Sequence, residues 1–253
     1  MAYIVENKMV FKKERRKILA RLFNWFVAFC LTLSWPLRWA AAKDNKQYQG
    51  GVMKLPLPKK EGTVSVERAI KQRRTIRAYM PQLLVLDQVS QLLWAAQGIT
   101  EDSGFKRAAP SAGALYPMDV YAVAGQDSVE QIEAGVYHYE PKGHSLSLVT
   151  KRDLRDSIAR AALSQMWMAK APINLVITAE YRRVAVKYGN RGIRYAMIEA
   201  GHIGQNLFLQ AEALGLKAGI VGAFHDKELI EIMKIPRTHE PLLIISVGYA
   251  AAV

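Results

Sequence analysis

The sequence predicts an α+β domain in which helices flank a central mixed β-sheet. Four short runs rich in β-branched and aromatic residues have strand character, and two longer segments repeat apolar residues at helical spacing. Strands and helices do not alternate strictly, so a doubly wound parallel sheet is not expected. With 253 residues and 51% hydrophobic composition, the chain is long enough for one substantial core and too short for two large domains.

Residues 1–42 have the composition of an export signal or a membrane anchor. A basic run over residues 12–17 precedes an apolar stretch over 22–37, and a short alanine run ends the segment. Arg15-Arg16 resembles the twin-arginine pair of a pathway that exports folded proteins, although an ordinary signal or anchor also begins with basic residues. We expect cleavage and export to the periplasm by the twin-arginine route. If the segment is retained, residues 18–38 would attach the protein to a membrane.

The formal charge of +13 is partly a property of this segment. Residues 1–42 carry eight basic and two acidic side chains, and the remaining chain has no basic patch interleaved with aromatic residues, so no nucleic-acid partner is expected. The only cysteine, Cys30, lies in the apolar stretch, which excludes disulfides and a cysteine nucleophile from a processed chain. The five histidines have no metal-ligand spacing, so no metal is expected.

Residues 43–62 mix Lys, Gln, Gly and Pro without periodicity and predict a linker, which places the folded domain at residues 63–253. A short helix is expected from Ser65, with Val66 and Ile70 on its buried side. This helix carries a run of arginines at its end.

The central elements follow from apolar spacing and turn residues. Asp87 is expected to cap a second helix that ends at Gly98. Strands are expected at residues 120–124, 136–139, 146–149 and 174–178. A hairpin turn over residues 141–143 is expected to join the second of these strands to the third.

The strongest helical pattern covers residues 193–214, with Gly215 as its C-terminal stop. Its apolar residues occupy several faces, so it must lie centrally or against another subunit. His202 on this helix is expected to be a packed core histidine rather than an acid or a ligand. The apolar stripe comprises Met197, Ala200, Ile203, Leu207, Ala211 and Leu214.

Two motifs carry chemistry. In the segment over residues 107–119, small residues would let the backbone approach a flat cofactor, although a tight turn before a strand has similar residues. About 35 residues upstream, three guanidinium groups and one hydroxyl lie within six positions, which suits a phosphate but also describes a solvated charge run. Together they predict a ligand with a planar ring and a phosphate tail. The residues are Pro110, Ser111, Ala112 and Gly113 in the first motif, and Arg73, Arg74, Thr75 and Arg77 in the second.

Together with residues 187–195 and 199–206, these motifs resemble the flavin-dependent nitroreductase superfamily, and in particular its SagB-type branch of thiazole/oxazole-forming peptide dehydrogenases. The resemblance runs from about Val66 to Tyr249. It implies FMN as cofactor and hydride transfer at flavin N5 to or from a small organic or peptide-derived substrate. It also implies a homodimer with the long helix at its core and flavin sites between subunits. Azoline peptide dehydrogenation is a narrower alternative, and a flavin-binding module without turnover is another.

The resemblance assigns roles to individual residues. Arg73, Arg74 and Thr75 would hold the phosphate and ribityl end of FMN, and Arg77 would lie near the pyrimidine edge. The loop over residues 110–113 would pass beside the ring, and residues 219–224 would approach it from another side through Val221 and Gly222.

Lys187 and Tyr188 match a pair that handles the proton in azoline dehydrogenation. A lysine acts as a base only when it is neutral, and nearby cations favour the neutral form. Lys187 could equally be a surface residue. The cations close to it in the sequence are Arg182, Arg183, Arg191 and Arg194.

The chain departs from the family in one respect, because residues 247–253 lack the basic residue that relatives place beyond the last strand. Phosphate affinity is therefore expected to depend on Arg73 and Arg74. Export would also separate the protein from cytoplasmic NAD(P)H, so a partner protein, a quinone or the substrate would have to supply electrons.

Overall fold

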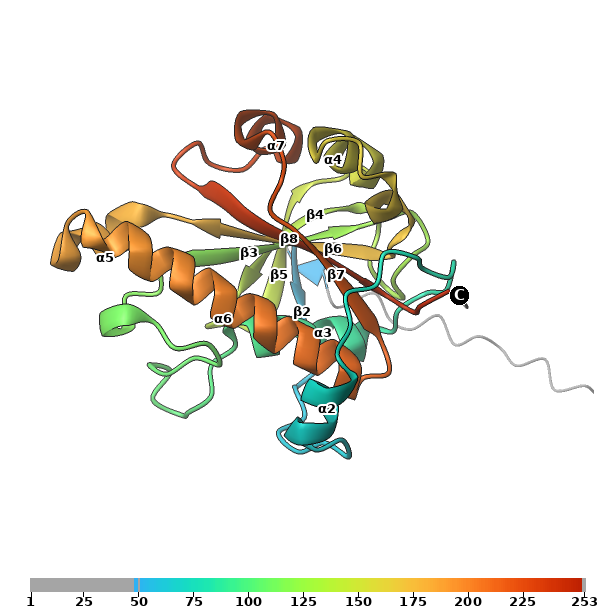
Figure 1. Cartoon of the computed structure of the whole chain (residues 1–253), viewed down its shortest axis with the longest axis horizontal. Helices are drawn as coiled ribbons and strands as arrows, with labels where there is room; N and C mark the ends of the chain where they lie inside the picture. The colour runs from blue at the N-terminus through green and yellow to red at the C-terminus, as the bar shows by residue number, and fades with distance from the viewer. Residues whose placement is uncertain (1–47, 50, 252–253) are drawn as a thin grey trace, which may run out of the picture. The chain divides into compact units, whose positions relative to one another are not determined.

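The computed structural model describes residues 48–49 and 51–251. The expected export segment lies outside these residues. The strands are β1 (Tyr48–Gln49), β2 (Val52–Lys54), β3 (Met118–Ala124), β4 (Gly135–Glu140), β5 (Ser145–Thr150), β6 (Ile173–Ala179), β7 (Lys217–Val221) and β8 (Glu240–Gly248) (Figure 1). The helices are α2 (Val66–Gln72), α3 (Leu86–Gln97), α4 (Arg155–Ala161), α5 (Tyr181–Tyr188), α6 (Arg191–Ala213) and α7 (Asp226–Met233), with 3₁₀ turns η1 (Ala112–Ala114) and η2 (Met166–Lys170).

The strands form one eight-stranded sheet in the order β1-β2-β5-β4-β3-β6-β8-β7. Each neighbouring pair of these strands is antiparallel. In the described residues, parallel pairing occurs only at isolated bridges such as Thr75 with Ala218. The expected α+β class is therefore confirmed, but the expected mixed pairing is corrected to an antiparallel sheet, because hairpins and long returns connect its strands.

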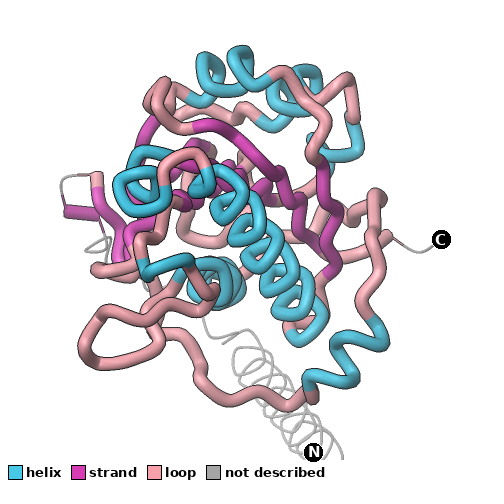
Figure 2. The backbone as a smooth tube through the Cα atoms, turned by 60° about the vertical axis from the view of Figure 1, so that its left-hand side comes forward, coloured by secondary structure: helices cyan, strands magenta, loops and turns pink. Residues whose placement is uncertain are grey.

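Helices cover both faces of this sheet (Figure 1). Side chains alternate along β3, so that Val120 and Ala122 join the core beneath α3 and α6, whereas Tyr121 and Val123 join the core beneath α4, η2 and α7. Figure 2 shows α6 running across the strands on its face of the sheet. The result is a three-layer arrangement with two hydrophobic cores.

Helix α6 ends where the sequence predicted a C-terminal stop at Gly215, and its end forms a Schellman motif. Gly215 adopts a positive φ of 71°, and its N–H donates to Glu212 O at 3.1 Å, while Leu216 N–H donates to Ala211 O at 2.8 Å. Within the predicted apolar stripe, Ala200, Ile203, Leu207 and Ala211 are buried, but Met197 is 53% exposed. The stripe is therefore core over most of its length, and the N-terminal part of the helix has an uncovered apolar side.

Helix α2 forms where Ser65 predicted it, because the Ser65 hydroxyl accepts from Arg68 N at 3.2 Å and caps the first turn. The predicted buried side was wrong: Val66 and Ile70 are exposed, and the buried residue of the helix is Ala69. Helix α3 begins at Leu86, with Asp87 in its first turn rather than at the cap.

The predicted linker over residues 43–62 is corrected within its described part. Strand β2 pairs with β5, and Met53 is fully buried in the core beneath α3. The following residues are also fixed to α3, because Gln91 accepts from Lys59 N at 2.8 Å and donates to Lys59 O at 3.0 Å. Ser90 donates to Pro56 O at 2.6 Å. Residues 52–59 are therefore part of the folded domain.

Candidate functional site

The arginine-rich segment runs from the end of α2 along the edge strand β7. Ile76 N–H donates to Ala218 O at 2.9 Å, which holds the segment against the sheet. A side chain at Gly219 could not be accommodated, because its Cβ would lie 2.5 Å from Ile76 O. Gly219 is thus required for this close backbone approach.

The three guanidinium groups of this segment point in different directions. Arg73 lies over the ring of Phe208 on α6, 5.3 Å from its centroid, and Arg77 lies 5.7 Å from the ring centroid of Trp167. Arg74 turns back and donates to Lys71 O at 3.0 Å and Arg73 O at 2.8 Å. Within residues 51–251 no carboxylate forms an ion pair with any of the three. Their charge is available to an anion, but one phosphate does not face all three.

The loop over residues 110–113 has an unusual backbone. Gly113, Ala114 and Tyr116 have φ values of 62°, 53° and 46°, in the left-handed region that favours glycine. The Ser111 hydroxyl accepts from Tyr116 N at 2.9 Å and closes the turn. Pro110, Ala112 and Gly113 are small residues, and Pro110 and Gly113 are exposed.

This loop lies against the predicted catalytic pair, far from it in the sequence. A Cβ at Gly113 would lie 2.8 Å from Tyr188 Oη and 3.2 Å from Lys187 Nζ. Both residues occupy the last turn of α5, and the Tyr188 ring packs edge-on against Tyr195 at 5.1 Å. The fold therefore brings together the small-residue loop and a pair of proton-bearing groups.

The environment of Lys187 differs from the sequence expectation in one respect. Arg183, one of the expected neighbouring cations, is itself neutralised: its Nη1 lies 2.8 Å from Asp119 Oδ2 and its Nε 2.7 Å from Glu180 Oε2. Its Nη1 also donates to Tyr116 O at 3.4 Å. Arg183 thus joins α5 to the end of the small-residue loop.

Two polar clusters beside the loop were missed by sequence reasoning. In the first, the Glu199 carboxylate on α6 is 2% exposed and accepts from Gln97 Nε2 at 3.1 Å, and Arg107 donates to Gln97 Oε1 at 3.1 Å. Burial raises the pKa of Glu199 against the opposing effects of Ser111, Gln97 and Arg107. The signal available in the sequence was the position of Glu199 among the apolar residues of the predicted long helix.

The second cluster surrounds Asp119 at the start of β3. His138 Nε2 lies 2.9 Å from Asp119 Oδ1, and His138 Nδ1 lies 2.7 Å from Glu140 Oε1. The contact between Asp119 Oδ2 and Arg183 is an ion pair without hydrogen-bond alignment. Burial alone would raise the pKa of Asp119, but the His138 hydrogen bond and the Arg183 charge together lower it.

The two remaining candidates for the cofactor site differ in exposure. Val221 is a buried core residue, so only its backbone could contact a ligand, whereas Gly222 is exposed and no atom lies closer than 4.0 Å to a Cβ built there.

Two polar residues of α6 lie outside the apolar stripe. His202 is exposed, although it was expected to be packed in the core. Asn206 donates to Ala95 O and Ala108 O at 3.0 and 3.3 Å and so supports the loop from behind. The described residues contain no cluster that could hold a metal ion.

Comparison with known proteins places the chain among nitroreductases. Residues 70–249 match the model of the nitroreductase family. A protein of Methanocaldococcus jannaschii named as a nitroreductase is 42% identical over 199 residues, which cover 79% of this chain and 98% of that protein. The microcin B17-processing protein McbC of Escherichia coli is 29% identical over 167 residues, or 64% of this chain and 61% of McbC.

A solved structure agrees with these matches. A crystal structure of a nitroreductase from Ralstonia eutropha superposes with a TM-score of 0.68 at 28% identity, covering 80% of this chain and 91% of that one. The resemblance to the nitroreductase superfamily is therefore confirmed, and the match to McbC agrees with the expected likeness to its SagB-type branch.

Proposed function

The chain belongs to the nitroreductase family of oxidoreductases, and from this premise we propose that it is an FMN-dependent enzyme acting on a small organic or peptide-derived substrate. The observation that carries the proposal is the contact of the Gly113 loop with Lys187 and Tyr188. Bound flavin would supply a two-electron donor or acceptor at N5. The residues of the chain would then bind the cofactor, orient the substrate and move a proton.

The donor set fits a phosphate-bearing flavin. Arg73 and Arg77 lie on either side of Thr75, and none of the three side chains forms an ion pair or hydrogen bond with another described side chain. Forked guanidinium donors and a hydroxyl suit phosphate and ribityl oxygens. We assign the phosphate to Arg73 and Thr75 and the ring edge to Arg77. Arg74, expected to share this role, points away from the other two.

Lys187 and Tyr188 are the proposed proton-handling groups. Their polar ends meet at the exposed Gly113, so a substrate held beside this loop could exchange a proton with either group. In the oxidising direction the amine of Lys187 would take the proton from carbon while two electrons leave with the hydride. Azoline peptide dehydrogenation is the narrower form of this reaction, and the sequence match to a microcin-processing protein supports it.

A homodimer is part of the proposal. Ile193, Met197 and Ile198 on α6 are 41%, 53% and 50% exposed, and no atom lies within 4 Å of a Cβ built at Gly201 on the same helix. Such an apolar helix side is costly in water. We propose that a second copy covers it and contributes to the flavin site.

Export remains a proposal based on the first 42 residues, with the twin-arginine route preferred and a membrane anchor over residues 18–38 as the alternative. In residues 51–251 no helix has both the length and the hydropathy needed to cross a bilayer. An exported enzyme would depend on an electron donor other than NAD(P)H.

The test is a visible absorbance spectrum of the purified full chain, followed by anaerobic titration with NADH and NADPH. Oxidised-flavin bands are expected, and failure of both nicotinamides to bleach them would support a different donor. Arg73→Ala should weaken FMN binding by about 10- to 100-fold, as expected for one charge-assisted hydrogen bond of about 1.5–3 kcal/mol. Arg74→Ala is the matched control and should retain the flavin. Well-folded protein that stays colourless with excess FMN would contradict the proposal.

A further inference from the structure

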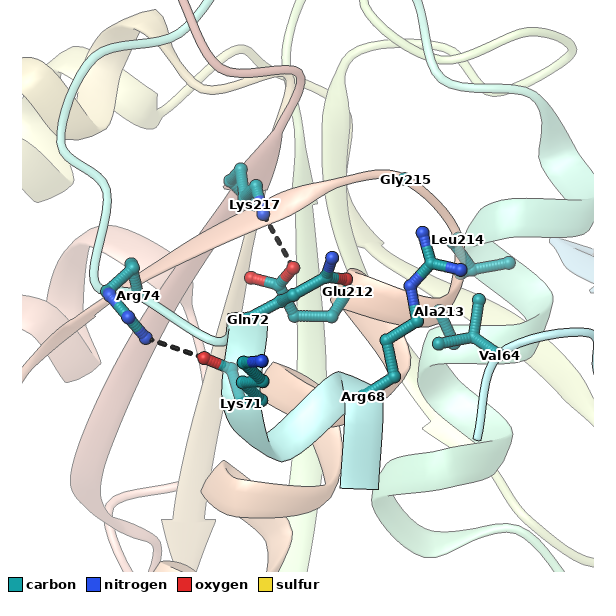
Figure 3. Close-up of a pocket in the computed structure, with 10 residues that line it drawn as sticks. All are labelled: Val64, Arg68, Lys71, Gln72, Arg74, Glu212, Ala213, Leu214, Gly215 and Lys217. Carbon is teal, nitrogen blue, oxygen red and sulfur yellow. Dashed lines mark hydrogen bonds and ion pairs between the residues drawn. The ribbon is translucent and has the colours of Figure 1, made fainter. Parts of the chain in front are cut away.

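An open pocket of about 870 Å³ lies where the end of α2 meets the end of α6 and the start of β7. Its volume is within the range of about 300–1,000 Å³ that small-molecule sites occupy. Figure 3 shows Arg68 and Lys71 from α2, with Arg74 beyond its end, around this pocket, together with Lys217. None of the residues that the proposed function assigns to the flavin or the proton pair lines this pocket, whereas Arg74, which the sequence had placed at the flavin phosphate, does.

The pocket is strongly cationic. Lys217 Nζ lies 2.5 Å from Glu212 Oε2, so the single carboxylate is already neutralised. Arg68, Lys71 and Arg74 have no carboxylate partner in the part of the chain that the structure describes. The C-terminal ends of α2 and α6 each contribute about −0.5 charge, which leaves a net charge of about +2.

Like charges lie close together around the pocket when no ligand is bound. Arg68 and Lys71 are three residues apart on α2, a spacing at which like charges repel one another, and Arg74 adds a third cation beyond the end of the helix. Glu67, the acidic residue of α2, forms no ion pair with these cations in the described residues and does not line the pocket. A dianion bound between the side chains would remove this repulsion.

Arg74 is already positioned for such a ligand. Its Nη1 donates to Lys71 O and Arg73 O, at 3.0 and 2.8 Å, which fixes the guanidinium at the rim while Nε and Nη2 make no hydrogen bond to described residues. Holding the side chain in advance lowers the entropy cost of binding. Val64 and Leu214 supply an apolar wall beside the charges.

We propose that this pocket is a second anion site, which binds a soluble phosphate ester or diphosphate separately from the flavin. Phosphate fits better than a single carboxylate because it brings about two negative charges and three acceptor oxygens to cations that approach from several directions. The apolar wall would contact the body that carries the phosphate. This anion site has no part in the proposed oxidoreductase reaction, and the proposal of the site does not depend on that reaction.

The test is calorimetric titration of the full chain, supplemented with FMN, with inorganic pyrophosphate. Saturable binding of one equivalent is expected, without loss of flavin absorbance. The double variant Arg68→Ala/Lys71→Ala should bind pyrophosphate about tenfold or more weakly, because two of the cations are lost. The control Arg152→Ala/Arg237→Ala removes two exposed cations outside the pocket and should bind as the parent does.

Several results would overturn the proposal. Equal weakening in the control variant would mean that net charge, not the pocket, attracts the anion. Equal affinity for malonate would remove the preference for phosphate, and release of FMN by pyrophosphate would identify the pocket as part of the flavin site. Binding to phosphatidic-acid vesicles without binding to free pyrophosphate would assign the headgroup of a lipid instead. If the chain binds no FMN, the titration still measures the affinity of the pocket for pyrophosphate. Failure of the proposed FMN-dependent function can therefore be distinguished from failure of the anion site.

Discussion

At the residue scale, Gly113 is constrained both by its backbone angle and by the close side chains of Tyr188 and Lys187. Its φ of 62° lies in the left-handed region, and its neighbours Ala114 and Tyr116 already hold similar angles at a cost of about 1–2 kcal/mol each. The Ser111 hydroxyl and Asn206 offset part of this cost by fixing the loop. Such stored strain is typical of loops that hold a ligand.

We predict that Gly113→Ala lowers the free energy of unfolding by about 1–2 kcal/mol, because alanine is strained at this φ. The new Cβ would also displace Tyr188 Oη and Lys187 Nζ, which lie within 3.2 Å of its position, so turnover should fall more than FMN affinity. Denaturant unfolding and steady-state kinetics measure the two effects. Gly62→Ala is the control, since Gly62 has open space and no positive φ. Equal effects of both substitutions would refute the role of the loop.

Glu199 shows why single residues can escape sequence reasoning. Its hydrogen-bond partner Gln97 comes from α3, and Arg107, which donates to Gln97, comes from the segment before the loop, so the cluster exists only after three segments have packed. The arginine motif shows a related limit: the sequence does not reveal that the chain extends after α2 and directs Arg73 and Arg74 to different neighbours.

At the scale of elements, the Asp119 cluster anchors α5, which carries Lys187 and Tyr188. His138 on β4, Arg183 on α5 and His239 before β8 all face Asp119, at 2.9, 2.8 and 3.9 Å, and Glu140 and Glu180 flank these side chains. Burial lowers the pKa of His239. Burial lowers the pKa of His138, but its hydrogen bonds to Asp119 and Glu140 outweigh this and raise it overall. The anchor is therefore strongest when His138 is protonated and Asp119 is ionised.

We predict a loss of stability as the pH rises through the raised pKa of His138. A histidine with a raised folded-state pKa contributes its full stabilisation below its unfolded-state pKa of about 6.5. This stabilisation is lost as the pH rises through the folded-state pKa. At the acidic end, the contribution of Asp119 is lost as the pH falls through its lowered pKa. Unfolding free energies measured from pH 5.5 to 9 should decline more steeply for the parent than for His138→Gln. Parallel pH curves for the two proteins would show that the histidine is not part of the anchor.

The same scale shows where local pattern was sufficient. Helix α3 and most of α6 were found because their apolar period matches one buried face. The four predicted strands were found because their short apolar runs are rich in β-branched and aromatic residues, and β3 and β6 are buried on both faces. Helix α5 was missed because Val184 is its one buried residue, and β2 was missed because three residues between Gly and Pro carry no period. Val66 and Ile70 misled the assignment of the α2 face because apolar residues also occur on exposed surfaces.

At the scale of the whole molecule, the uncovered side of α6 predicts association. Met197→Glu should convert a dimer to a monomer, because it places a charge in an apolar contact that lacks a partner for it. Light scattering after size exclusion measures the change. Leu57→Glu is the control, at an exposed leucine remote from α6 in sequence, and should leave the dimer intact. A parent protein that is monomeric at micromolar concentration would contradict the prediction.

Strand β2 has a consequence for where this domain can be cut. Its three residues satisfy backbone groups on the outer side of β5, and Met53 fills the hydrophobic space beneath. A fragment that began at residue 63 would leave the edge of β5 unpaired and a cavity in the core behind it. The exposed edge could then pair with a strand of another molecule. Proteolysis of the amino-terminal region must therefore cut upstream of this strand if the released domain is to keep its fold.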